Sequence, residues 1–149
     1  IGDLSDEDID VKVDKGVVYV DISDKLLFKS GSFSISDKAK TVLGKVAKVL
    51  AAQPNIEFMV EGHTDSKQLL DNGSALEDNW DLSVKRATTV VRVLQETYGI
   101  DAKRMTAAGR GEYAPIVENN SAANRARNRR TRIVILPQLD QFFKLLEKK

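Results

Sequence analysis

Residues 36–60, SDKAKTVLGKVAKVLAAQPNIEFMV, predict a helix followed by a buried strand. Ser36 stands at the expected N-cap of the helix, and Pro54 ends it. Between them the apolar side chains recur at helical spacing, at Ala39, Val42, Leu43, Val46, Val49 and Leu50. The next run, residues 56–60, is almost entirely apolar, as in a strand covered on both faces. Strand, helix and strand in this order predict a right-handed parallel crossover.

Strand and helix patterns continue on both sides of this unit. Residues 11–13 and 17–22 alternate apolar and polar around Asp14-Lys15-Gly16, which predicts a hairpin. A second amphipathic helix is predicted over residues 80–98, followed by strands at 102–108 and 131–136. The order β-α-β-α-β-β predicts an α+β fold: a two-layer α/β sandwich, with a mixed sheet and helices on one face.

Composition bounds the class of protein. The chain has 149 residues, of which 42% are apolar, so we expect one compact domain, over residues 17–137. An acidic lead-in or strand (1–16) precedes this domain, and a C-terminal amphipathic helix (138–149) follows it. The formal charge of +1 and the lack of aromatic residues among the arginines of segment 125–132 argue against a nucleic-acid partner. No apolar run reaches the roughly 20 residues that span a bilayer. Because the chain starts at Ile1, we expect an excised piece whose membrane anchor lies elsewhere.

Three polar clusters stand out against these core-forming segments: EGHTD (61–65), NWDLSVKRA (79–87) and NRARNRR (124–130). The first follows the buried strand, at the carboxyl end where α/β folds usually place their sites. In the second, Arg86 lies four residues from both Leu82 and Val90, so we expect a partly shielded guanidinium with an anionic partner. A carboxylate and two guanidiniums gathered at one end of a sheet would suit a small zwitterion.

These residues resemble the OmpA-like C-terminal domain, a peptidoglycan-binding domain shared by OmpA, the Pal lipoproteins and MotB. The resemblance covers residues 17–137 and rests on LFKSGS (27–32), GHTD (62–65), NWDLSVKRA (79–87), GRGE (109–112) with Pro115, and NRR (128–130). It implies noncovalent binding of peptidoglycan through the diaminopimelate of the stem peptide, without a cofactor. It also implies a periplasmic location, as the soluble domain of an outer-membrane or, as the second choice, an inner-membrane protein.

The resemblance also implies which residues bind. Carried over residue by residue, the ligand-binding set is Asp65, Asn79, Arg86 and Arg129, with Thr64, Ser30, Gly31 and Ser32 lining the mouth. The chemistry agrees, because diaminopimelate ends in an ammonium beside a carboxylate. A carboxylate side chain accepts from the first, and a guanidinium binds the second through two parallel hydrogen bonds. Residues 66–78 form a longer connection than in OmpA and Pal, closer to the layout of MotB.

Other interpretations remain open for several residues. Asp65 and Arg86 could pair with each other as a structural salt bridge. Trp80 lies on an apolar stripe, which favours a place in the core over a sugar-stacking surface. His63 is the only histidine, so a metal site or a catalytic pair lacks partners, and an enzyme acting on peptidoglycan is disfavoured. A protein-interaction module, with the C-terminal helix as its partner surface, is a further alternative.

Overall fold

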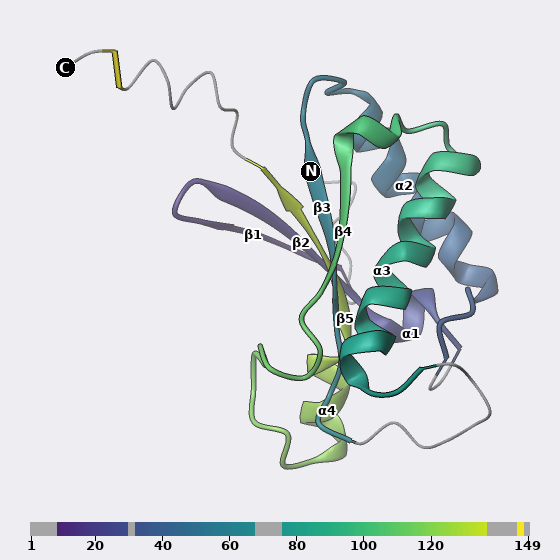
Figure 1. The fold of residues 1–149 in the computed structure, drawn as a ribbon, viewed down its shortest axis with the longest axis vertical. Helices are drawn as coiled ribbons and strands as arrows, with labels where there is room; N and C mark the ends of the chain where they lie inside the picture. The colour runs from purple at the N-terminus through teal and green to yellow at the C-terminus, as the bar shows by residue number, and fades with distance from the viewer. Residues whose placement is uncertain (1–8, 30–31, 68–75, 137–145, 148–149) are drawn as a thin grey trace.

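The computed structural model describes residues 9–29, 32–67, 76–136 and 146–147, and shows a five-stranded sheet with helices packed on one face (Figure 1). The strands lie in the order β1-β2-β5-β3-β4. Their bounds are β1 Ile9–Asp14, β2 Val17–Ser23, β3 Phe58–His63, β4 Met105–Gly109 and β5 Arg130–Ile135. The helices are α1 Asp24–Leu27, α2 Asp37–Ala51, α3 Asn79–Glu96 and α4 Ala122–Asn128, with a short 3-10 helix at Ala102–Arg104. The predicted mixed sheet with helices on one face is confirmed.

The elements with strong periodicity form where they were expected. β1 and β2 are an antiparallel hairpin whose turn places Lys15 and Gly16 at φ 51° and 80°. Two consecutive residues with positive φ form a turn whose twist matches the right-handed twist of the two flanking strands. α2 and α3 lie within a residue or two of the predicted helices. Ser36 is the N-cap residue of α2, but its hydroxyl donates to the Leu26 carbonyl instead of capping the helix.

The connections between strands differ from the simple crossover. β5 lies between β2 and β3 and is antiparallel to both, so β2 and β3 run in the same direction without pairing. The parallel neighbours are β3 and β4, which α3 connects. β3 also extends to His63, so that Glu61, Gly62 and His63 belong to the strand and the loop begins at Thr64.

The core fills the space between the sheet and helices α2 and α3. Fully buried side chains from the sheet, among them Phe58 and Ile133, pack with Leu43 of α2 and with Val90 and Leu94 of α3. Apolar burial of this kind is the main favourable term in folding. In Figure 1 the two helices lie side by side over the same face of the sheet.

Two glycines let α3 touch the sheet directly. Gly62 of β3 and Gly109 of β4 are paired, and both lie under Ser83 of α3. A Cβ atom on Gly62 would overlap the Ser83 carbonyl, and one on Gly109 would lie 2.7 Å from the Val84 nitrogen. This contact holds the N-terminal half of α3 over the ends of β3 and β4.

Some sequence predictions fall outside the described residues. These are the acidic lead-in over residues 1–8, Ser30 and Gly31 of the site, residues 68–75 of the long connection, and most of the C-terminal helix at 137–145 and 148–149. Within the described ranges, no helix is both long and apolar enough to cross a membrane.

Candidate functional site

Four charged side chains of alternating sign meet at the end of the sheet where β3 ends and β5 begins. Nη1 of Arg86 is ion-paired with Oδ1 of Asp24. Oδ2 of the same carboxylate lies 3.8 Å from Nε of Arg129, and Nη1 of Arg129 lies 2.6 Å from Oδ2 of Asp65. The order Arg86, Asp24, Arg129, Asp65 therefore forms a continuous chain of ion pairs.

Strand register explains why these residues meet. Ser23 of β2 and His63 of β3 both lie opposite Arg130, the first residue of β5. The residues just beyond these positions, Asp24, Asp65 and Arg129, must then leave the sheet at the same end. The backbone nitrogen of Asp24 donates to the carbonyl of Arg129 at 3.1 Å, which fixes the two segments to each other.

Arg86 forms the floor of this group and is only 3% exposed. Its Nε donates to the Ser32 carbonyl at 2.8 Å, and its guanidinium lies 5.0 Å from the centre of the Phe28 ring. Burial lowers the pKa of Arg86. Burial also raises the pKa of Asp24, because desolvation of the carboxylate outweighs the attraction of Arg86 and Arg129.

The predicted shielding of Arg86 and its need for an anionic partner are confirmed, but the partner is Asp24. The alternative salt bridge between Asp65 and Arg86 is not formed. Sequence reasoning missed Asp24 because no local spacing links it to Arg86, 62 positions away. Its position just before the LFKSGS motif was the one available signal.

Arg129 is the most accessible of the four charged side chains, and Asp65 is paired with it. The side chain of Arg129 is 36% exposed and that of Asp65 is 10% exposed. Oδ1 of Asp65 also accepts from the Lys67 nitrogen at 3.0 Å, so the carboxylate is held from two sides. Asp65 and Asp24 are thus about equally buried, with the partly exposed Arg129 between them.

Asn79 and Thr64 are buried and hold the loop that carries Asp65. Nδ2 of Asn79 donates to the carbonyls of Lys67 at 2.8 Å and Asp65 at 3.3 Å. The Thr64 nitrogen donates to the Gly111 carbonyl at 2.9 Å, and its hydroxyl donates to the Asp65 carbonyl. The structure thus brings together Asp65, Asn79, Arg86, Arg129, Thr64 and Ser32.

The two neighbours of Arg129 in the NRR motif have structural contacts instead. Asn128 is fully buried; its Oδ1 accepts from the nitrogens of Ile116 and Val117 at 2.9 and 3.2 Å. Arg130 is 5% exposed and donates to the carbonyls of Asn128 and Ala114, and burial lowers its pKa to about 10. Only the middle residue of the motif faces the site.

His63 is buried beside the site and bonded to Glu61, with 2.6 Å between Nε2 and Oε1. Burial lowers the pKa of His63, and the nearby positive charges of Arg130 and Arg132 lower it further. The hydrogen bond and charge of Glu61 act in the opposite direction but do not outweigh burial. The imidazole is therefore neutral at pH 7. Among the residues described, no group of three or more His, Cys, Asp and Glu side chains has the arrangement of a metal site.

Lowering the pH from about 7.5 to about 5.5 is expected to destabilise the domain. The folded pKa of His63 lies below its usual value of 6.5, so in this window the unfolded chain binds a proton that the folded domain does not. The free energy of unfolding then falls as the pH falls. Glu61, whose pKa is lowered from 4.5, titrates below this window.

Urea unfolding at both pH values measures the change. His63→Gln should remove most of it, and an unchanged pH dependence in that variant would exclude His63 as the cause.

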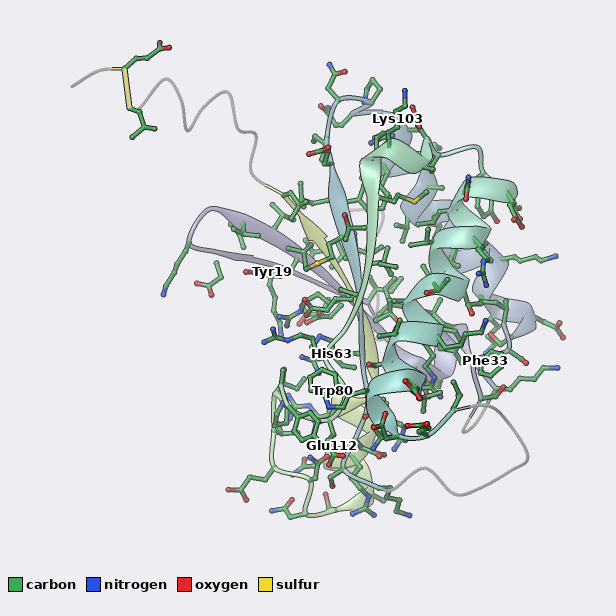
Figure 2. All side chains as sticks on the ribbon, in the orientation of Figure 1. Tyr19, Phe33, His63, Trp80, Lys103 and Glu112 are labelled. Atoms are coloured by element: carbon green, nitrogen blue, oxygen red, sulfur yellow. The ribbon has the colours of Figure 1, made fainter. Side chains whose placement is uncertain are left out.

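Trp80 lies on the surface, so its predicted place in the core is wrong. The side chain is 47% exposed and packs against Tyr113, with 5.0 Å between the ring centres. At the first turn of α3 the ring lies beside Tyr113 and Gly111, outside the core cluster between helices and sheet. Figure 2 shows Trp80 between His63 and Glu112, at the end of the molecule that carries the site.

Curated relatives match most of this chain. Motility protein B of Bacillus subtilis is 32% identical over 130 residues, which are 87% of this chain and 49% of that protein. The outer-membrane lipoprotein YfiB of Pseudomonas aeruginosa is 31% identical over 138 residues, 89% of this chain and 78% of that protein. The chain spans about half the length of Motility protein B and of a second Bacillus subtilis relative, YtxE.

Solved structures share the fold. A MotB-like protein from Desulfovibrio vulgaris superposes with a TM-score of 0.81 at 32% identity, covering 87% of this chain and 82% of that one. The cell wall anchor of the type VI secretion system (T6SS) from Pseudomonas aeruginosa gives a TM-score of 0.78 at 33% identity, covering 89% and 90%. A sequence model of the OmpA family matches residues 27–129. Motifs, fold and relatives agree: this chain belongs to the OmpA family.

Proposed function

We propose that this domain binds peptidoglycan noncovalently, through the diaminopimelate of the stem peptide, and so attaches a membrane-associated protein to the cell wall from the periplasmic side. The observation that carries the proposal is the Asp65–Arg129 pair, in which a buried carboxylate and a partly exposed guanidinium place both charges side by side. A related structure is described as a cell wall anchor, which supports the same role.

The ion pairs suggest how a zwitterion is bound. The ligand ammonium replaces Arg129 at Asp65, and Arg129, whose side chain is 36% exposed, then turns to bind the ligand carboxylate. Once Arg129 has moved, the buried guanidinium of Arg86 becomes the second donor for that carboxylate. Ligand binding thus exchanges one set of ion pairs for another, which favours specificity over raw affinity.

The same geometry argues against catalysis. His63 is buried and neutral with Glu61 as its partner, and Asp65 is bonded to Arg129, so neither forms an acid–base pair facing a substrate. We infer that the domain binds the wall without cutting it. Incubation with purified sacculi should release no soluble muropeptides, and their appearance would refute this inference.

A stem peptide with lysine at its third position should bind at least about tenfold more weakly, a difference of roughly 1.4 kcal/mol. Lysine keeps the side-chain amine but lacks the carboxylate, so Arg129 and Arg86 lose their shared partner in the complex. Titration calorimetry with matched diaminopimelate and lysine peptides measures the ratio. Equal affinities would exclude zwitterion recognition, even if the domain binds cell wall. Equal losses of both affinities as salt rises would point instead to nonspecific charge attraction.

A further inference from the structure

An exposed aromatic surface lies next to the charged site. Trp80 and Tyr113 are 47% and 64% exposed, and their rings stack with 31° between the planes. Val84, one helical turn along α3, is 44% exposed and extends the apolar surface. Exposed aromatic side chains in a cluster commonly mark binding surfaces, whereas single exposed apolar residues need no explanation.

The backbone under the rings is firmly held. The Ser83 hydroxyl donates to the Trp80 carbonyl and accepts from the Gly111 nitrogen, both at 2.9 Å. This joins the first turn of α3 to the segment that carries Tyr113. Gly111 has φ 58°, and a Cβ there would lie 3.3 Å from both rings, so the aromatic pair sits directly on this backbone. A rigid aromatic surface binds a flat apolar face with little loss of side-chain entropy.

The aromatic surface is continuous with the charged site through Asn79. Nδ2 of this residue donates to the Asp65 carbonyl and lies 3.4 Å from Oε1 of Glu112. Asn79 thus contacts the loop that carries Asp65 and directly precedes Trp80 in the chain. Its other contact, Glu112, directly precedes Tyr113. A ligand that occupies the charged site has the aromatic pair beside it.

We propose that Trp80 and Tyr113 bind a sugar ring of the glycan strand to which the stem peptide is attached. A pyranose presents a face of C–H groups that packs on an aromatic ring, while its hydroxyl and acetamido groups stay in water or reach polar neighbours such as Glu112. The glycan is the favoured occupant because it is covalently joined to the peptide in the adjacent site. This inference rests on the proposed function and adds a second recognition element to it.

Two matched ligands test the proposal: the free stem tetrapeptide, and the same peptide carrying its N-acetylglucosamine–N-acetylmuramic acid disaccharide. The wild-type domain should bind the disaccharide peptide about tenfold more tightly than the free peptide. Trp80→Ala or Tyr113→Ala should remove most of this difference and leave the affinity for free peptide within about twofold. Val13→Ala, which removes a 70% exposed side chain of β1, serves as the control and should change neither affinity.

Several outcomes would overturn the proposal. Equal binding of the two ligands by the wild-type domain is one, and equal weakening of both by Trp80→Ala is another. A third is that Trp80→Ala changes only self-association in sedimentation velocity, which would assign the aromatic pair to a second copy of the chain.

Failure of the peptide site itself is detected separately. Trp80 is the only tryptophan, so fluorescence excited selectively at tryptophan reports on this surface. Peptide-free glycan strands should shift that fluorescence even if the stem peptide does not bind. The absence of a shift would refute sugar binding independently of the proposed function.

Discussion

Asp65→Ala is expected to weaken binding of diaminopimelate-type sacculi by at least about 30-fold, because losing one partner of a desolvated charge pair typically costs about 2–5 kcal/mol. The only other carboxylate among the described residues of the ion-pair chain is Asp24, which is about equally buried but is already paired with Arg86. Without Asp65 the ligand ammonium has no counter-charge, and Arg129 loses the group that now holds it. Co-sedimentation with sacculi and titration with the diaminopimelate peptide measure the loss.

Asp14→Ala is the matched control, since it removes an exposed carboxylate in the β1–β2 hairpin and leaves the site unchanged. The control should sediment like wild type and keep the same urea midpoint. If Asp65→Ala also sediments like wild type, the site assignment is wrong. If Asp65→Ala unfolds, the ion pair with Arg129 is structural and the ligand binds elsewhere.

Arg86→Met is expected to lower the free energy of unfolding by about 3–5 kcal/mol, because it leaves the buried Asp24 carboxylate without its closest cation. Arg129, at 3.8 Å from Asp24, is too distant to replace the lost ion pair in full. Urea unfolding measures the change. Arg92→Met, at an exposed position of the same helix, should cost less than about 0.5 kcal/mol.

A double-mutant cycle separates this ion pair from general damage to the core. Asp24→Asn combined with Arg86→Met should lose less stability than the sum of the two single changes, with a coupling of at least about 1 kcal/mol. The double variant should still fail to bind the stem peptide, because the deep guanidinium is absent. Additive losses would show that Asp24 and Arg86 do not depend on each other, which would remove Asp24 from the site.

The sequence predicted the elements whose signal is local. The apolar spacing of residues 39–50 located α2, and alternation around Lys15-Gly16 located the hairpin. The pairing of β5 between β2 and β3 could not be predicted in this way, because it joins segments more than 60 residues apart through contacts that leave no local pattern. The motif resemblance nevertheless identified residues that the fold brings to one end of the sheet.

Two features near the site could not be predicted from apolar periodicity. Trp80 continues an apolar stripe, but its ring packs on Tyr113 outside the core, and periodicity does not show where the core stops. α4 was missed because AANRARN has no apolar stripe. Its one local signal is Ser121, whose hydroxyl accepts from the Asn124 nitrogen as an N-cap.

Gly62 and Gly109 lie so close to Ser83 that no other residue fits at either glycine without a shift of the backbone. Even alanine must push α3 away from the sheet, and Asn79 and Arg86 then move with the helix relative to Asp65, which lies in the loop after β3. A genetic screen for loss of cell-wall attachment would therefore return substitutions at two glycines that never touch the ligand. Such alleles would mimic binding-site mutants in the cell, and only a measurement of folding stability would tell the two kinds apart.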